Sequence, residues 1–451
     1  MKGFIQTIRN IFSIEELRTR ILNTLGLILI YRLGSYIVLP GVDPAELGRM
    51  AEQSSEGLLG MINMFAGGAF SRASIFALGI MPYISASIVI QLLGIAVPYF
   101  QKLQRDGESG RNKINQITRV LTIAITAVQS IGYLINLNTQ SPGALAFTGP
   151  DPAMSQFMFM FTNVVVLTTG TMFVMWLGEK ITDRGIGNGI SLIIMIGIIA
   201  NLPVSLFAEF ESRLGAGGGL VFFLLEMVAL LAVVFAVVML VQGTRRIPVQ
   251  YAKRIVGNRQ YGGVRQYLPL KINASGVMPI IFAQALMFIP STVAQFFQDS
   301  DAWQGVGAAF NDFTSFTYNF TFAILIILFT YFYTAVTVNS KQISEDLKRN
   351  GGFIPGVKPG RKTAEFIDTI MSRITLPGSI FLAIVAILPA FAMLLKVNTQ
   401  FAQFYGGTSL LIMVAVVLDT LQQVESHLLM RKYDGLMKSG RIKGRSAGGS
   451  I

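Results

Sequence analysis

Residues 64–97 read MFAGGAFSRASIFALGIMPYISASIVIQLLGIAV, and this stretch decides the fold. It starts as an apolar segment, is interrupted by Gly67, Gly68 and Arg72, and continues as a fully apolar helix with Pro82 inside it. A chain that only crosses a bilayer has no need of glycine and serine on the approach to its span. A short, weakly held half-helix that leads into a span is instead typical of an element that moves aside inside a membrane.

The composition places the whole chain in a membrane. Of its 451 residues, 52% are hydrophobic and 13% are charged, and the mean hydropathy is +0.57. Apolar runs of about 20 residues recur, which is the length that a helix needs to cross about 30 Å of hydrocarbon. These features predict an all-α polytopic membrane protein and exclude a water-soluble globular domain.

Residue types that carry covalent chemistry are scarce. The chain has no cysteine and a single histidine, His427. The absence of cysteine excludes disulfides, thiolate catalysis and cysteine-bound metal. One histidine alone cannot build a metal site or a Ser-His arrangement. Residues 182–191, TDRGIGNGIS, contain three glycines, but their spacing fits neither a dinucleotide fingerprint nor a P-loop. We interpret this stretch as a tight turn between two helices. We expect no enzyme activity, no cofactor and no metal.

The apolar runs predict ten membrane spans in a single membrane domain. The spans cover residues 21–39, 75–97, 117–137, 154–177, 189–208, 218–241, 272–296, 317–338, 373–395 and 405–424. They divide into two pseudo-symmetric halves of five helices, residues 1–212 and 213–451. Each half has an unusual second element, and this pairing hints at an inverted repeat with its working site between the halves.

The charges of the connecting loops alternate along the chain. Lys and Arg collect around residues 98–116, in 242–271, in 339–372 and after 425, whereas the other loops carry mostly Asp and Glu. Because cytoplasmic loops are enriched in Lys and Arg, this pattern predicts that both termini are cytoplasmic. It also locates most of the net charge of +12 on that side of the membrane.

The loop 242–271 is longer than topology requires. It contains strand-like pieces, Ile247–Lys253 and Gln266–Leu270, around a turn at Gly257 and Asn258, and we expect an ordered basic hairpin. Two interpretations of its charge remain open: the general cytoplasmic bias, or a docking surface for an acidic partner such as ribosomal RNA. The candidate docking residues in this loop and in 339–372 are Arg245, Arg246, Lys253, Arg254, Arg259, Lys358 and Arg361.

Long ordered stretches of the chain resemble the SecY/Sec61-alpha family of translocon channel proteins. Besides residues 64–97, they are GESGRNKINQITR (107–119), TGTMFVMWLGEKITDRGIGNGISLI (169–193), RRIPVQYAKR (245–254), LPLKINASGVMPIIFA (268–283), FYTAV (332–336), GGFIPGVKPG (351–360) and YGGTSLLI (405–412). One position departs from the pattern. Where many family members read G-I-R-P-G, this chain has Lys358 in place of arginine, which keeps the charge but loses the bidentate fork.

The resemblance implies an hourglass of ten helices that opens to lipid between its halves. A lateral gate would lie between the spans 75–97 and 272–296. The plug would be about residues 58–72, with Met64, Phe65, Gly67, Gly68 and Arg72 as its candidate residues. The pore ring would consist of Ile80, Ile84, Ile190, Ile194, Ile281 and Ile412. Only the resemblance singles these positions out, because isoleucine in a membrane span does not by itself indicate a pore.

The resemblance also implies a function and partners. The chain would be the central protein-conducting channel of the Sec translocon in the bacterial inner membrane, passing unfolded preproteins and releasing transmembrane segments sideways. SecE and SecG would be its membrane partners, and the SecA motor and the ribosome would dock on the cytoplasmic loops. A signal sequence is an apolar helix, and it gains about 25 cal/mol per Å² of apolar surface on leaving water for the lipid bilayer.

A secondary transporter of a small solute is the alternative, and a membrane-embedded enzyme is a third, weaker one. Ion-coupled transporters carry ionisable residues deep in their spans. Here Arg32 and Glu226 lie toward the periplasmic ends of their spans, and Asp419 and Glu425 lie near the cytoplasmic end. A passive pore needs no such groups, because a hydrophobic constriction gates by dewetting.

Overall fold

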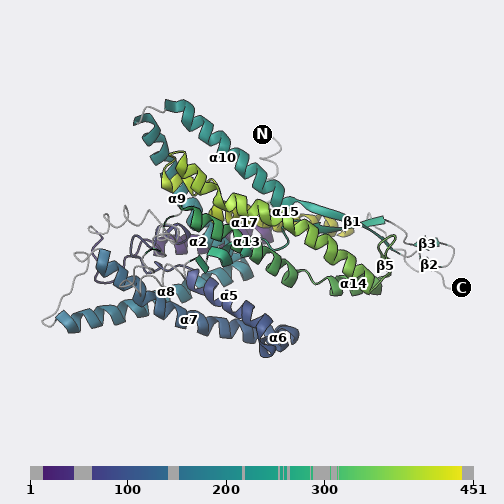
Figure 1. Cartoon of the computed structure of the whole chain (residues 1–451). Helices are drawn as coiled ribbons and strands as arrows, with labels where there is room; N and C mark the ends of the chain where they lie inside the picture. The colour runs from purple at the N-terminus through teal and green to yellow at the C-terminus, as the bar shows by residue number, and fades with distance from the viewer. Residues whose placement is uncertain are drawn as a thin grey trace. The chain divides into compact units, whose positions relative to one another are not determined.

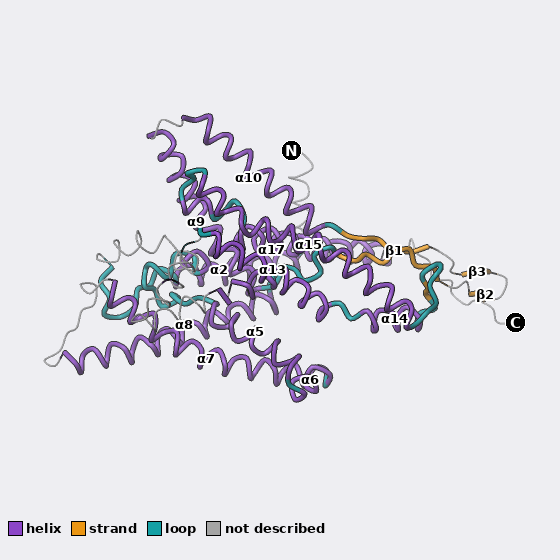
Figure 2. Tube along the Cα trace, viewed as in Figure 1, coloured by secondary structure: helices purple, strands orange, loops and turns teal. Residues whose placement is uncertain are grey.

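The computed structural model describes residues 14–44, 63–140, 152–215, 219–251, 254–256, 259–261, 265–284, 286–287, 305, 312 and 314–438. Helices dominate these residues, and the described strands lie within residues 244–271 and 352–353 (Figures 1 and 2). The helices are α2 (Glu15–Gly34), α5 (Met81–Ala96), α6 (Pro98–Arg105), α7 (Gly107–Gln140), α8 (Pro152–Arg184), α9 (Gly189–Gly215), α10 (Gly219–Gln242), α13 (Phe316–Thr337), α14 (Ser340–Arg349), α15 (Arg361–Leu394), α16 (Thr399–Ala402) and α17 (Gly407–Lys438). The strands are β1 (Thr244–Tyr251), β2 (Arg254–Val256), β3 (Arg259–Tyr261), β4 (Arg265–Lys271) and β5 (Gly352–Phe353).

Seven helices in the described part of the chain are long and apolar enough to cross a membrane. They are Gly107–Asn138, Met154–Arg184, Gly189–Leu214, Gly219–Gln242, Phe316–Arg349, Arg361–Leu394 and Gly407–Leu428. The pair α5 and α6, bent by 100° at its break, raises the count to eight if it forms one broken span. α2 overlaps the first predicted span, and much of the predicted span 272–296 lies outside the described residues. The chain is a multi-pass helical membrane protein, and the count of ten stays a prediction.

The helix α10 illustrates why such segments suit a bilayer. Its sequence is GLVFFLLEMVALLAVVFAVVMLVQ, and apolar residues lie on every side of the helix. Only 11% of its most apolar 18-residue stretch is buried within the protein. A helix satisfies its backbone hydrogen bonds internally, so it can stand in hydrocarbon without a protein neighbour. The exposed apolar surface of α10 is therefore suited to lipid.

The approach to α5 differs from our expectation. We predicted an apolar helix from residue 75 with Pro82 inside it, but the helix begins at Met81 and Pro82 lies in its first turn. Proline is tolerated there because its missing N–H would have no partner within the helix. Among the residues before it, only 63–65 are helical and the rest form turns, since Gly67, Gly68 and Gly79 have φ of +65°, +81° and +54°. The prediction of a helix from residue 75 is wrong. The predicted plug half-helix, of which residues 58–62 lie outside the described residues, stays a prediction.

The chain divides into two compact units. Unit 1 comprises residues 1–54, 62–201 and 416–451, and unit 2 comprises residues 55–61 and 202–415. Within unit 1, α7 packs against α5, α6 and α8, and α2 packs against α8 (Figure 1). Within unit 2, α13 and α14 pack along α15. The division into halves at residue 212 stays a prediction.

A stripe of small hydroxyl residues lies on one buried face of α7. Thr118, Thr122, Thr126 and Ser130 are spaced four residues apart, which places them on the same side of the helix. Each hydroxyl donates a hydrogen bond of 2.6–2.9 Å to the carbonyl four residues before it. The polar groups are thereby satisfied inside α7, and their small size suits the close helix packing typical of membrane proteins.

The predicted tight turn between α8 and α9 is confirmed. Gly187 has a φ of +82°, and a Cβ on Gly189 would lie 2.0 Å from the carbonyl oxygen of Gly178 on α8. Asn188 caps α9, because its side-chain oxygen accepts hydrogen bonds from the backbone N–H groups of Ile190 and Ser191 at 3.2 and 3.3 Å. The glycines therefore serve close packing of two helices.

The predicted basic hairpin is also confirmed. β1 follows α10 directly and pairs antiparallel with β4, with Ile247 opposite Leu268, and its last residues pair with β5 (Figure 2). β2 and β3 pair with each other, Val256 opposite Arg259. The predicted turn residues between them, 257 and 258, lie outside the described residues.

Gly170 on α8 gives a test of backbone packing in unit 1. A Cβ at this position would lie 2.1 Å from the carbonyl oxygen of Ile75. We expect Gly170→Ala to lower the free energy of unfolding by about 1–3 kcal/mol because α8 must shift away. Thermal unfolding of the purified protein in detergent measures this change.

Gly132 on α7 is the matched control, because a Cβ there would meet no atom within 4 Å. Gly132→Ala should leave the midpoint temperature of thermal unfolding unchanged or raise it, since alanine is favoured over glycine in a helix by about 1 kcal/mol. Equal destabilisation by both variants would contradict the proposed packing.

Candidate functional site

The first candidate site is the described part of the predicted plug, residues 63–72, which we call the plug segment. It belongs to unit 1, and residues 58–62 of the predicted plug lie outside the described residues. Met64, Phe65, Ala66, Ala69 and Phe70 are all buried. An irregular backbone of this kind is tolerated at membrane depth only where protein covers it or it lines a cavity.

Side chains satisfy the carbonyls of the plug segment. Arg32 on α2 donates a hydrogen bond from Nη1 to the carbonyl oxygen of Gly67 at 2.8 Å. Arg72 donates from Nη2 to the same oxygen at 2.7 Å and from Nε to the carbonyl oxygen of Gly68 at 2.9 Å. The hydroxyl of Tyr133 on α7 donates to the carbonyl oxygen of Phe70 at 2.8 Å. Four hydrogen bonds from three side chains thus satisfy three carbonyls that lack helix partners.

The glycine pair also permits a close approach to α9. A Cβ on Gly67 would lie 3.0 Å from the Cα of Gly197, and a Cβ on Gly197 would lie 2.6 Å from the carbonyl oxygen of Phe65. We expected Gly67 and Gly68 to make this element loosely held, and this stays a prediction; the structure gives the two glycines a further role. Both residues adopt positive φ, which directs their carbonyls to the arginines and brings their backbone against a helix.

Residues 73–80, which follow the plug segment, are attached to their neighbours by backbone hydrogen bonds and by the packing of Phe76. The backbone N–H of Leu39 donates to the carbonyl of Ala73 at 2.8 Å, and that of Ile75 donates to the carbonyl of Ile37 at 2.9 Å. The ring of Phe76 lies against two glycines: a Cβ on Gly34 of α2 would be 2.1 Å from it, and one on Gly170 of α8 would be 3.3 Å away. Residues 73–80 are therefore fixed to α2, to the residues that follow α2, and to α8.

The six residues of the predicted pore ring come from four places in the chain. Ile80 precedes α5 and Ile84 lies on it, Ile190 and Ile194 lie one turn apart on α9, Ile281 lies in the helical stretch 278–284, and Ile412 lies on α17. Ile80, Ile194 and Ile412 are buried, and the other three are half-buried. The first four belong to unit 1 and the last two to unit 2, and their meeting in one ring stays a prediction.

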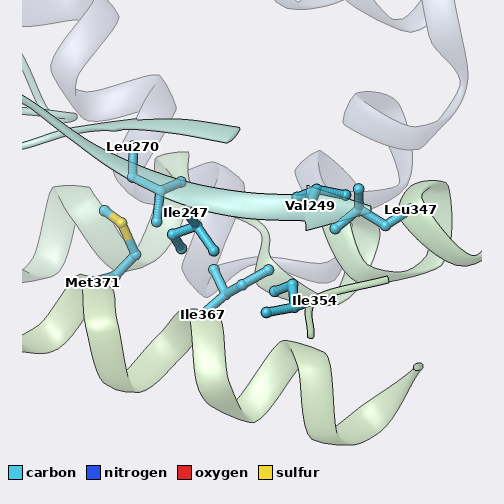
Figure 3. Close-up of a cluster of buried hydrophobic side chains, with 7 residues drawn as sticks. All are labelled: Ile247, Val249, Leu270, Leu347, Ile354, Ile367 and Met371. Atoms are coloured by element: carbon cyan, nitrogen blue, oxygen red, sulfur yellow. The ribbon is translucent and has the colours of Figure 1, made fainter. Parts of the chain in front are cut away.

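The second candidate site is a platform in unit 2 formed by the hairpin, α14, β5 and the start of α15. Alternate residues of β1, Ile247 and Val249, belong to a buried cluster with Ile367 and Met371 of α15; Ile247 lies above Ile367, and Val249 lies beside Leu347 of α14 (Figure 3). Leu270, Leu347 and Ile354 complete this buried cluster. The apolar core fixes the hairpin on α15, so that its basic residues project from a rigid base.

Several predicted docking residues are exposed on this platform. Arg245, Arg246 and Lys358 are exposed, and the Arg361 side chain is paired at the surface with Glu365 at 3.1 Å. The loop that presents Lys358 is held by Thr363, whose hydroxyl donates to the Lys358 carbonyl at 3.0 Å. Arg254 and Arg259 lie on β2 and β3, and Lys253 lies outside the described residues.

A buried ionic cluster in unit 2 was missed by sequence reasoning. Arg213 pairs with Glu209 at 2.8 Å and with Glu226 of α10, and it donates to the carbonyl of Lys396 at 3.1 Å. Glu209 also accepts a hydrogen bond from the backbone N–H of Asn398 at 2.8 Å. The predicted span 189–208 leaves Glu209 in a loop, although its i,i+4 spacing to Arg213 is a visible signal of an ion pair. The cluster joins α9, α10 and the segment before α16.

Together these features define a class of protein: a multi-pass helical membrane protein with a buried irregular segment between two helices and a basic platform on a hairpin. A family model described as SecY matches residues 74–421. The chain belongs to the SecY family.

Two curated relatives carry the same description, protein translocase subunit SecY. The one from Escherichia coli is 43% identical over 443 residues, covering 96% of this chain and 96% of the relative. The one from Chlamydia muridarum is 40% identical over 460 residues, covering 97% and 99%.

Three solved structures share the fold at low identity. A protein-conducting channel aligns with a TM-score of 0.59 at 17% identity, covering 91% of this chain and 92% of that one. A SecY protein described by a plug domain that stabilises the closed state aligns at 0.56 and 18%, with the same coverage. Canine Sec61 in a ribosome–channel complex aligns at 0.57 and 15%, again covering 91% and 92%.

The platform core yields a prediction about the hairpin. Ile367 is 0% exposed, and truncation to alanine leaves a cavity beneath β1. We expect Ile367→Ala to lower the local free energy of unfolding by about 2–5 kcal/mol. Hydrogen exchange of the β1 and β4 amides should accelerate accordingly.

The neighbouring Phe366 is a control on the same helix, because it is 36% exposed and outside the cluster. Phe366→Ala should leave hairpin exchange nearly unchanged. If Ile367→Ala gave no faster exchange than Phe366→Ala, the hairpin would not depend on this core.

Proposed function

We propose that this chain is the protein-conducting channel subunit of a bacterial Sec translocon, passing unfolded preproteins across the inner membrane and releasing transmembrane segments sideways. Membership of the SecY family over nearly the whole chain supports this function. The observation that carries it is the buried plug segment, an irregular backbone inside a bundle of membrane helices. A bundle that only crossed a bilayer would have no use for such a segment.

The proposed mechanism is physical and involves no covalent step. Ten spans with both termini in the cytoplasm surround a pore that residues 58–72 plug and six isoleucines seal. An apolar constriction excludes water, and ions cannot cross it while it is dry. A signal sequence opens the gate between the spans 75–97 and 272–296 because its apolar surface is more stable in lipid than in water.

The proposed partners follow from the same assignment. SecE and SecG would complete the channel in the lipid bilayer, and preproteins with a signal sequence would be its substrates. The SecA motor and the ribosome would dock on the basic loops 242–271 and 339–372, where Arg245, Arg246 and Lys358 are exposed. The basic charge of the platform is favourable for an acidic or RNA surface.

The first test is translocation into proteoliposomes that contain this chain with SecE, supplied with SecA, ATP and a precursor that carries a signal sequence. Precursor should become protected from protease only in vesicles that contain the chain. Absence of protection with folded, correctly oriented protein would overturn the channel function and favour the solute transporter.

A second test concerns the pore ring. We expect Ile194→Asn to increase ion leak several-fold, because a polar side chain lowers the cost of wetting an apolar constriction. Ion efflux from the same proteoliposomes measures the leak.

Ile193→Asn is the matched control for the pore ring. Ile193 is 1% exposed and Ile194 is 5% exposed, but adjacent residues of a helix point about 100° apart. Both variants bury a polar group in α9, so an equal leak from both would contradict the assignment of Ile194 to the ring.

A further inference from the structure

The plug segment and the residues after it are held by two kinds of contact, and the difference locates a latch. We infer that Arg32 on α2 acts as a latch: its hydrogen bond to the Gly67 carbonyl keeps residues 63–72 in place. We also infer that Ala73 is the hinge at which these residues part from the fixed residues that follow it. The inference rests on the proposed function only in taking residues 63–72 as the plug.

The geometry separates the bonds that release must break from those that it preserves. Both bonds of Arg72 end on carbonyls of Gly67 and Gly68, within its own segment, so they travel with it. They fix the glycine turn and present the Gly67 carbonyl to α2. The bond from Arg32 to that carbonyl, 35 residues away in sequence, comes from α2 and must break. Two longer-range hydroxyl bonds must break with it, from Tyr31 of α2 to the Ala66 carbonyl at 3.5 Å and from Tyr133 of α7 to the Phe70 carbonyl.

The site also has features that make the hold reversible. The acceptor of Arg32 is a neutral carbonyl, and bonds of this kind are weaker than those between two charged groups. Arg32 and Arg72 share that one acceptor, and both guanidinium groups lie over the ring of Tyr36, at 5.4 and 4.3 Å from its centre. The ring attracts both cations and so offsets the repulsion between them, and the contact with Arg72 also holds the plug segment against the residue that follows α2.

Ala73 has the backbone of a hinge. Its φ is +45°, a left-handed conformation that is disfavoured for any residue with a Cβ. Its carbonyl is bound to the N–H of Leu39, and three residues later Phe76 is wedged against Gly34 and Gly170. The chain is thus strained at residue 73, fixed after it, and held before it by side-chain hydrogen bonds.

The experiment uses cysteine accessibility, because the chain contains no cysteine of its own. Ala69 in the plug segment and Ala77 beyond the hinge are each 0% exposed. Ala69→Cys and Ala77→Cys are introduced separately into the full chain, reconstituted with SecE in proteoliposomes. The rate of labelling by a water-soluble maleimide is then measured.

Arg32→Met keeps the length of the side chain but removes its donors. We expect it to raise the labelling rate at position 69 about tenfold, the effect of losing one hydrogen bond to a charged group, and to leave position 77 unchanged. Arg32→Lys, which restores a charged donor, should return the rate toward that of the parent chain.

Arg20→Met is the matched control. Arg20 lies on the same helix and donates from Nη1 to the carbonyl of Gly185 at 3.3 Å, away from the plug segment. It should leave both labelling rates unchanged. If Arg32→Met does not fold, Tyr133→Phe removes another of the bonds from the surrounding helices to the plug segment and should also accelerate position 69 alone.

Ion leak, measured on the same vesicles, separates the latch from the proposed function. Faster labelling at position 69 together with more leak supports both. Faster labelling without leak supports the latch and contradicts the role of the segment as a plug. Unchanged labelling, equal acceleration at positions 69 and 77, or the same acceleration with Arg20→Met would each overturn the latch.

Discussion

The absence of water in a bilayer is the constraint on which the rest of this structure depends. Every backbone N–H and C=O in hydrocarbon needs a partner from the protein itself, and helices provide it without help. Residues 63–80 are not a regular helix, so their carbonyls need donors from elsewhere. Arg32, Arg72 and Tyr133 supply them. The irregular segment and the polar side chains around it are therefore one feature, since neither could be buried without the other.

The same constraint explains where glycine is needed. Gly197 brings α9 against the backbone of the plug segment, Gly170 brings α8 against the carbonyl of Ile75, and Gly189 brings α9 against Gly178 of α8. In each place a backbone meets a backbone at a distance that leaves no room for a Cβ. Close approach of this kind is the usual route to tight packing in lipid, where burial of apolar surface between helices gains little.

The sequence predicted regular elements well and irregular ones poorly. Apolar runs located the long helices, and alternation around a turn located the hairpin, because both depend on local periodicity. The interpretation of Gly67 as an interruption assumed a helix, whereas the residue occupies a turn stabilised by Arg32 from 35 positions away. Glu209 falls just beyond the predicted span 189–208; its i,i+4 spacing to Arg213 is a local signal. The contacts of that cluster with Glu226 and Asn398, like the contact of Arg32 with Gly67, are long-range, and no local pattern contains them.

The polar and apolar contacts of residues 63–80 respond to water in opposite ways. A hydrogen bond to a carbonyl exchanges with a bond to water at a small net cost in free energy, so entry of water weakens the bonds from Arg32 and Tyr133 to the plug segment. The burial of Phe65 and Phe70 before Ala73, and of Phe76 after it, becomes more favourable when the alternative is exposure to water. Entry of water would thus loosen these side-chain hydrogen bonds, which are found before Ala73, and leave the apolar contacts on both sides of it. The strained φ of Ala73 lies at the end of the segment that these hydrogen bonds hold, which is where a movable segment must part from its anchor.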